Sequence, residues 1–214
     1  MDKKSQAYEY LKHAIIVDEI PPGSPLVELE LSESLQMSRT PIREAMRQLE
    51  TEGLVTTYPA RGSFVTVLTP DDVQEIYELR LALELWALER SIARITDEEL
   101  DALQAAFEEG YRTGAWETLH NADRGLHDLI TEKAWSRRLL MLLSLLNTQA
   151  ERIRYQSAQS LGRDDLSYRE HLHIIQCIRE RDLEKSRAAL RTHLRSVANS
   201  AMDAAKAQAV KSSL

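Results

Sequence analysis

Apolar residues recur at intervals of three and four positions along most of this 214-residue chain. Near the start, Tyr8, Leu11 and Ile15 fall on one side of a helical wheel. Such spacing indicates amphipathic helices that each bury one face. With only 7 Gly and 6 Pro in the chain, few of these helices are interrupted. The pattern therefore predicts a mainly α-helical globular protein that is long enough for two cores.

The first 69 residues combine three short helical patterns with the one convincing β pattern of the chain. Helices are expected at 4–17, 29–36 and 38–53, with Ser38 or Thr40 as the cap of the third helix and Gly53 at its end. Residues 54–58 and 63–67 are rich in β-branched and aromatic side chains, and Pro59-Ala60-Arg61-Gly62 between them is typical of a hairpin turn. This part of the sequence predicts a trihelical unit followed by a β-hairpin.

The segment Thr69-Pro70-Asp71-Asp72 breaks the apolar pattern, and Thr69 or Asp71 can cap a new helix there. We place a domain boundary at this point, which gives domains of 1–69 and 70–214. Beyond the boundary, helices are expected at 73–94, 97–110, 116–133, 136–157, 165–181 and 183 to about 209. The second domain is thus predicted to be an all-helical bundle.

Composition excludes several classes of protein. The single cysteine, Cys177, leaves no internal disulfide, and the polar start of the chain lacks the apolar segment of a secretory signal. The most apolar stretch, 139–146, is far shorter than the roughly 20 residues that span a bilayer. We therefore expect a cytoplasmic protein with no membrane partner. The formal net charge of -7 argues against non-specific coating of nucleic acid, so any DNA contact must come from a local basic patch.

One such patch is predicted on the third helix. Arg39, Arg43 and Arg47 recur every four residues and so share one face of that helix. A helix of this kind fits the major groove of DNA, where Arg donates two hydrogen bonds to guanine. Ser38, Thr40 and the helix N-terminus are placed to hold phosphates.

The hairpin strengthens the DNA interpretation. An arginine face alone is more often simply solvated, but here it lies on the last helix of a trihelical unit and precedes a wing with its own arginine. Arg61 at the hairpin tip is expected to reach an adjacent groove, and Gly62 lets the backbone approach closely. We therefore interpret the first domain as a DNA-binding unit whose partner is a double-stranded operator.

These residues resemble the GntR-type winged helix-turn-helix regulators. The resemblance is carried by Pro22-Gly23, Leu31-Ser32-Glu33-Ser34-Leu35, and residues 37–46, 49–55 and 61–65. It implies that the DNA-contact positions of the family are occupied by Ser38, Arg39, Thr40, Arg43, Arg61 and Gly62. Some relatives have an arginine just before the second helix, where this sequence has Leu29.

In the second domain, polar residues occupy helix positions that should be apolar. Asp123 and His127 are four residues apart on an otherwise apolar stripe, and His171 and His193 have comparable settings. Buried Asp and His need partners. One solution is that all four bind a divalent metal ion, with Zn preferred and Ni, Co or Mn as alternatives. The other is that each histidine is a hydrogen-bonded core residue; His120 and His173 match the stripe less well.

Residues 72 to about 205 resemble the helical effector domain of the FadR-like subclass, called FCD. The resemblance rests on the Asp123/His127 pair, Glu170-His171 and His193-Leu194. It implies a metal-centred pocket that binds a small carboxylate, and a homodimer. Arg80 either faces that pocket and pairs with the carboxylate, or forms a salt bridge with Glu84 one turn away.

Together these features predict a DNA-binding transcriptional regulator, a repressor in preference to an activator, controlled by a small-molecule effector. The alternative from another class is a metal-dependent hydrolase that uses the Asp/His cluster. No further residue is clearly placed as its general base, and four protein ligands exceed what most catalytic zinc sites use. A helical adaptor would leave the basic helix and the wing unexplained. We therefore expect no enzymatic activity.

Overall fold

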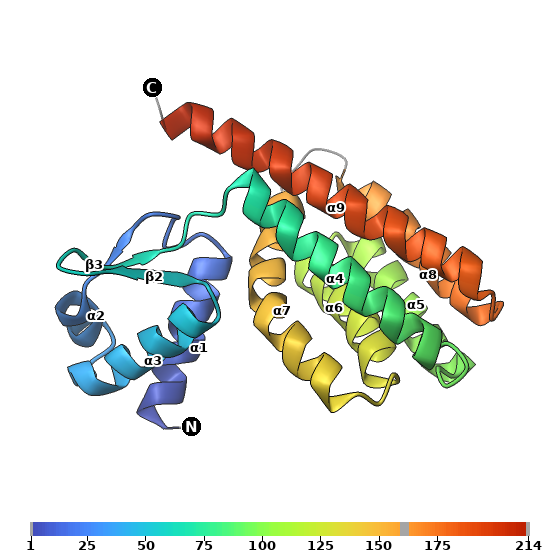
Figure 1. Cartoon of the computed structure of the whole chain (residues 1–214), viewed down its shortest axis with the longest axis horizontal. Coiled ribbons are helices and arrows are strands. Elements are labelled where there is room, and N and C mark those ends of the chain that lie inside the picture. The colour runs from blue at the N-terminus through green and yellow to red at the C-terminus, as the bar shows by residue number, and fades with distance from the viewer. Residues whose placement is uncertain (1, 159–162, 213–214) are drawn as a thin grey trace.

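The computed structural model describes residues 2–158 and 163–212 and consists of a small N-terminal unit beside a larger helical bundle (Figure 1). The N-terminal unit contains α1 (Lys3–Ile16), α2 (Glu28–Ser34) and α3 (Arg39–Thr51), with strands β1 (Pro25–Leu26), β2 (Val55–Tyr58) and β3 (Gly62–Val65). Helix α1 packs against α3 around a core that includes Leu11, Ile15, Ile42 and Leu49, all fully buried. The predicted trihelical unit and hairpin are confirmed.

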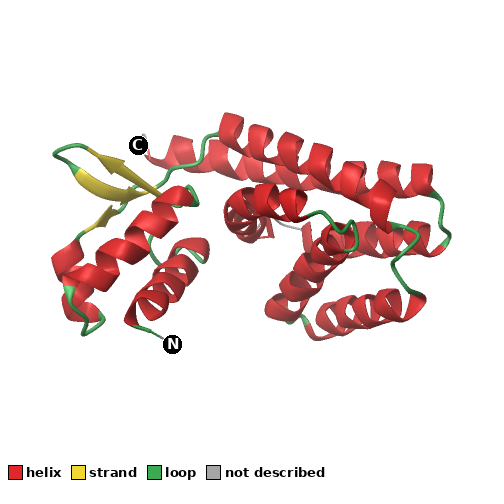
Figure 2. Cartoon of the chain, turned by 60° about the horizontal axis from the view of Figure 1, so that its bottom comes forward, coloured by secondary structure: helices red, strands yellow, loops and turns green. Residues whose placement is uncertain are grey.

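The sheet has three strands in the order β1-β3-β2, seen in yellow in Figure 2. Strands β2 and β3 form the expected hairpin, with Val55 opposite Val65. The expectation that this hairpin is the only β-structure is wrong, because β1 pairs antiparallel with β3. A strand of two residues carries no alternation that the sequence could reveal. Its place is fixed instead by a turn at Gly23, where φ is 78°.

The bundle contains α4 (Pro70–Ser91), α5 (Asp97–Thr113), α6 (Trp116–Glu132), α7 (Arg137–Ala158), α8 (Arg163–Arg179) and α9 (Leu183–Ser212). Helix α4 begins with a capping box, in which the Thr69 side chain accepts from the Asp72 backbone and Asp72 bonds back. Helices α4 and α9 run side by side along the length of the bundle (Figures 1 and 2). Among the described residues, no helix has the length and apolar character required to cross a membrane.

The two units have separate apolar cores, one formed by residues between 7 and 65 and the other by residues between 73 and 201. Polar contacts from α7 join them. Thr148 Oγ1 donates to Glu52 Oε2 at 3.0 Å, and Lys12 Nζ donates to Thr148 Oγ1 at 3.2 Å. The buried Arg152 donates through Nη1 to the Thr66 carbonyl at 2.6 Å. Helix α7 therefore connects the bundle to both the helices and the wing of the N-terminal unit.

Candidate metal centre and nucleic-acid interface

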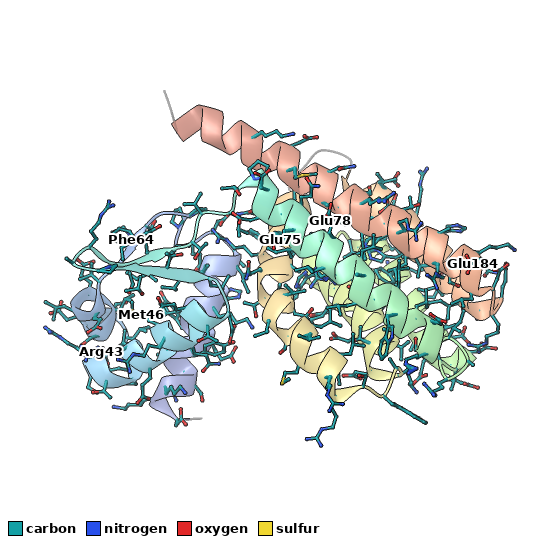
Figure 3. The ribbon with its side chains drawn as sticks, viewed as in Figure 1. Arg43, Met46, Phe64, Glu75, Glu78 and Glu184 are labelled. Carbon is teal, nitrogen blue, oxygen red and sulfur yellow. The ribbon has the colours of Figure 1, made fainter. Side chains whose placement is uncertain are left out.

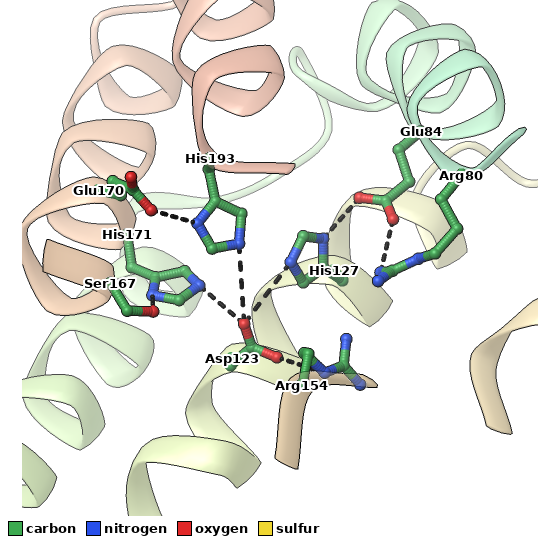
Figure 4. A network of polar contacts seen from close by, with 9 residues as sticks. All are labelled: Arg80, Glu84, Asp123, His127, Arg154, Ser167, Glu170, His171 and His193. Atoms are coloured by element: carbon green, nitrogen blue, oxygen red, sulfur yellow. Dashed lines mark hydrogen bonds and ion pairs between the residues drawn. The ribbon is translucent and has the colours of Figure 1, made fainter. Parts of the chain in front are cut away.

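Four buried side chains from three helices meet inside the bundle (Figure 4). Asp123 and His127 lie on α6, His171 on α8 and His193 on α9. One ligand atom from each residue can be chosen so that all four atoms lie within 4.8 Å of one another. The four residues that the sequence singled out are thus brought together, although they span 71 positions of the chain, from 123 to 193.

The three imidazoles surround one oxygen of Asp123. Asp123 Oδ1 lies 2.9 Å from His171 Nε2, 3.8 Å from His127 Nε2 and 3.9 Å from His193 Nε2. The Nε2 atoms of His127 and His193 are buried and have no hydrogen-bond partner among the described residues. Buried polar atoms are nearly always satisfied, so two orphaned nitrogens facing one carboxylate fit a bound cation. Three imidazole nitrogens and a carboxylate oxygen are a donor set that suits zinc and related ions.

Outer polar groups hold each ring by its other nitrogen. The Nδ1 contacts are 2.5 Å for His127 with Glu84, 3.0 Å for His193 with Glu170, and 3.4 Å for His171 with Ser167. Because a carboxylate only accepts, the Nδ1 of His127 and of His193 carries the proton and leaves Nε2 free as a ligand. This support of metal-binding histidines by carboxylates is typical of protein metal centres.

Electrostatics set the protonation states that a metal ion requires. Burial raises the pKa of Asp123, but the Arg154 guanidinium, whose Nε lies 3.0 Å from Asp123 Oδ2, and the imidazoles outweigh it and hold the pKa well below its ordinary value. Burial, together with the neighbouring His171, lowers the pKa of His193 to about 3. At neutral pH the carboxylate is therefore ionised and the His193 ring is neutral, as metal binding demands.

Arg80 forms the salt bridge with Glu84 that the sequence left as one of two alternatives. Arg80 Nη2 lies 2.7 Å from Glu84 Oε1, and both residues are 1% exposed. Burial raises the pKa of Glu84, but Arg80 and His127 outweigh it and lower the pKa to about 2. Within the part of the chain that the structure describes, the Nε and Nη1 atoms of Arg80 have no hydrogen-bond partner, and neither has the buried Tyr77 hydroxyl. Arg80 therefore keeps donors available beside the candidate metal centre.

A cavity of about 210 Å³ lies next to this centre and reaches the junction between the two units. His127 and Thr148 line it, together with four cationic and two acidic side chains, namely Lys12, Arg80, Arg124, Arg154, Asp128 and Glu151. Three of these residues could not be identified from the sequence, because each is ordinary within its own helix pattern: Lys12, Arg124 and Arg154. Lys12 lies on α1 in the other unit, so no local signal could have linked it to this cavity.

The remaining two histidines considered from the sequence lie outside the cluster. His120 stacks on Trp116 with ring centroids 4.8 Å apart, and its Nε2 lies 3.3 Å from Glu151. His173 contacts the sulfur of Cys177 at 3.8 Å. Both side chains have ordinary partners within the bundle.

The basic face of α3 is exposed. Ile42, Ala45, Met46 and Leu49 are buried, whereas the face with the three arginines, Arg39, Arg43 and Arg47, points to solvent. Figure 3 shows Met46 toward the interior of the N-terminal unit and Arg43 at its outer side. Ser38 occupies the N-cap position but makes no side-chain capping bond, and Thr40 in the first turn is also exposed. The helix thus presents both charge and hydroxyl groups outward.

The wing presents Arg61 at its tip. Ala60 and Gly62 both have positive φ, 62° and 93°, and they turn the chain tightly around Arg61. The Arg61 guanidinium lies 5.8 Å from the centre of the Tyr58 ring, and a Cβ at Gly62 would meet nothing within 4 Å. The backbone of the wing is therefore open to a close approach from outside.

Comparisons with known proteins agree along most of the chain. Residues 3–65 match the bacterial regulatory proteins of the gntR family, and residues 75–196 match the FCD domain. The regulator YdhC of Bacillus subtilis is 32% identical over 88% of this chain and 86% of its own length. The repressor RspR of Escherichia coli is 27% identical over 91% and 87%. A GntR structure from Rhodococcus has a TM-score of 0.80 at 22% identity and covers 95% of this chain and 99% of its own, which shows a shared fold.

Proposed function

The chain belongs to the GntR family of bacterial regulatory proteins and carries an FCD domain, and from this premise we propose a repressor controlled by a metal-dependent effector site. Membership makes the protein a DNA-binding transcriptional regulator and not an enzyme, so the hydrolase alternative has no support. The name of RspR as a repressor favours repression for this relative too. We further propose that residues 1–69 and 70–214 are its two functional domains.

The DNA contact is assigned to α3 and the wing. Ser38, Thr40 and the N-terminus of α3 hold phosphates, while Arg39, Arg43 and Arg47 enter the major groove. Arg61 and Gly62 approach the neighbouring groove. In a homodimer, two such units related by a twofold axis would bind a near-palindromic operator. The exposure of all these residues supports the assignment.

Replacement of Arg43 tests this assignment. The operator is first recovered by in vitro selection with the wild-type protein. Arg43→Ala should weaken binding to it by about 1–3 kcal/mol, because the arginine loses its contacts with a base. Arg138→Ala, an exposed arginine at the start of α7, is the matched control and should bind normally. Unchanged binding by Arg43→Ala, with an intact circular dichroism spectrum, would refute the role.

The metal ion is assigned to Asp123, His127, His171 and His193. The observation that carries this proposal is the convergence of four buried ligand atoms within 4.8 Å, two of them nitrogens without a partner. Zinc fits the donor set best, with Ni, Co or Mn as alternatives. Such an ion, when bound, supplies a Lewis-acidic centre that attracts anionic oxygen ligands.

Metal content tests the second assignment. Elemental analysis should find a divalent metal in purified wild-type protein and much less in the His171→Ala, His193→Ala double variant. His173→Ala, on the same helix as His171 but outside the cluster, is the matched control. Equal metal content in the wild-type protein and the double variant would leave the histidines as hydrogen-bonded core residues.

The effector is proposed to be a small carboxylate in the cavity of about 210 Å³. Four cationic side chains against two acidic ones favour an anion, and the unused donors of Arg80 suit a carboxylate. Lys12 and Thr148 line this cavity and also join the two units. A ligand that draws Lys12 away from Thr148 would alter that junction and so change the position of α3.

Thermal shift measurements with a panel of mono-, di- and tricarboxylates test the effector class, with Arg80→Met as the variant. A ligand that stabilises the metal-loaded wild-type protein should lose most of its effect in this variant. The same ligand should change operator affinity by roughly 5- to 150-fold, the usual range of such coupling. If no carboxylate binds, or if binding leaves operator affinity unchanged, the proposed control is wrong.

A further inference from the structure

Arg43 is held by a carboxylate on the neighbouring helix. Glu28, the first residue of α2, receives two parallel hydrogen bonds, from Arg43 Nε to Oε1 at 2.7 Å and from Arg43 Nη2 to Oε2 at 2.6 Å. The Arg43 side chain is 53% exposed and that of Glu28 is 31% exposed. An exposed ion pair of this kind contributes little to folding. Its main physical effect is to fix the plane of the guanidinium group.

The geometry of the pair leaves one edge of Arg43 available. A guanidinium group has five N–H donors in one plane, and Glu28 uses the edge formed by Nε and Nη2. The edge formed by Nη1 and the second Nη2 proton remains unused by Glu28. Two parallel donors on one edge match the O6 and N7 acceptors of guanine in the major groove. Glu28 therefore orients Arg43 without blocking this mode of base recognition.

The charge of Glu28 acts in a second way. Hydrogen bonds from Arg43, together with the charges of Arg43, Arg39 and Arg47, lower the pKa of Glu28, so the carboxylate is ionised at neutral pH. The Glu28 carboxylate lies beside the surface that approaches DNA, so its negative charge repels the DNA phosphates. At a site with no guanine for Arg43, only the neighbouring arginines offset this repulsion. At the correct site, the contact between the oriented Arg43 and guanine offsets it.

We infer that Glu28 is a specificity-determining positioning residue: it orients Arg43 for a guanine and penalises duplexes that lack one. This inference rests on the proposed role of α3 in DNA binding. It predicts that removal of the Glu28 charge makes the protein bind DNA less selectively, without loss of fold. A mere surface ion pair would have no such effect on sequence discrimination.

The test compares Glu28→Gln with Glu30→Gln in the full chain. Glu30 lies in the same first turn of α2, is exposed and forms no ion pair among the described residues, so it is a control for the charge change alone. Each protein is titrated with the selected operator and with a shuffled duplex of equal length, at several salt concentrations. Glu28→Gln should bind the shuffled duplex roughly three- to tenfold more tightly than wild type does. Its ratio of operator to shuffled affinity should fall by about tenfold.

The control should change both affinities by less than about twofold and preserve their ratio. Equal ratios for the two variants would overturn the inference. A wild-type protein that binds both duplexes equally would overturn the proposed function, and the inference with it. The two failures are thus distinguishable.

A third variant tests whether Glu28 acts through Arg43. Arg43→Lys keeps the charge but cannot form the two-pronged contact. In this background, Glu28→Gln should change the affinity ratio by less than about twofold. If it still reduces the ratio about tenfold, Glu28 acts independently and its positioning role is refuted. Circular dichroism should match wild type in every variant, because Arg43 is exposed and Glu28 is only partly buried.

Discussion

Replacement of Glu84 by glutamine should destabilise the helical bundle strongly, although the shape of the side chain is retained. Glu84 is 1% exposed and contacts Arg80 on one side and His127 on the other. Burial raises the pKa of Glu84, but Arg80 and His127 outweigh this effect and lower the pKa from 4.5 to about 2. At about 1.4 kcal/mol per pKa unit, the ionised form contributes about 3 kcal/mol to folding at neutral pH. Glutamine would leave Arg80 buried and unpaired, which carries a similar cost.

Urea unfolding of metal-free protein measures this loss. The three tryptophans, Trp86, Trp116 and Trp135, all lie in the bundle, so their fluorescence reports its unfolding separately from that of the N-terminal unit. Glu84→Gln should lower the free energy of unfolding by about 3 kcal/mol. Glu78→Gln, also on α4, is the control, because this exposed residue accepts a hydrogen bond from Gln74 and its replacement should change stability by less than about 0.5 kcal/mol.

A second substitution checks the cause. Adding Arg80→Met to Glu84→Gln removes the stranded charge and should recover most of the lost stability. Glu84→Gln alone should also weaken metal binding by roughly 10- to 100-fold, because His127 loses the carboxylate that orients it. The stabilising role of the ionised Glu84 is refuted if Glu84→Gln stays within about 1 kcal/mol of wild type, or if the added Arg80→Met recovers no stability.

Three further outcomes are expected. Because the pKa of His193 is lowered from 6.5 to about 3, the unfolded chain binds a proton below pH 6.5 that the folded chain does not bind. Metal-free protein should therefore keep its stability above pH 6.5 and lose about 2 kcal/mol of it by pH 5. Equal urea midpoints at pH 7 and pH 5 would contradict this. Gly53 has a φ of 76°, so Gly53→Ala should lower the stability of the N-terminal unit by about 1 kcal/mol, as measured by thermal melting. An unchanged melting temperature would mean that the turn adopts another conformation at no cost. Lys12→Met removes the hydrogen bond to Thr148 and should reduce the effect of a carboxylate on operator affinity. The control Lys4→Met should leave that effect unchanged. Equal responses of the two variants would exclude Lys12 from the coupling between effector and operator binding.

Helix positions could be predicted from the sequence to within a few residues, because apolar periodicity and capping residues act locally. Thr69 caps α4 as expected, and α5 begins at Asp97 as expected. Strand β1 could not be predicted, because two residues show no periodicity and their pairing with β3 depends on the folded chain. Local patterns thus determine the helices, whereas the third strand depends on tertiary contact.

The same distinction applies to the candidate site. His171 and His193 stand out because a polar residue interrupts an apolar stripe, and this signal is visible in each helix separately. Arg154 and Lys12 interrupt nothing, and they reach the site only because α7 packs between the two units. That Arg80 pairs with Glu84 and also lines the cavity likewise needed side-chain geometry, which spacing alone does not provide.

The connection between the wing and the bundle is very short. Only residues 66–69 separate β3 from α4, and both ends of this stretch are fixed, Thr66 by Arg152 and Thr69 by its capping box. Four extended residues span at most about 14 Å, less than half of the roughly 34 Å between half-sites one turn apart. A DNA-binding unit on so short a linker can tilt, but it cannot shift its position along the duplex. If the proposed homodimer forms, the promoters that it controls should therefore keep one invariant spacing between half-sites, and inserting half a turn of DNA should abolish regulation.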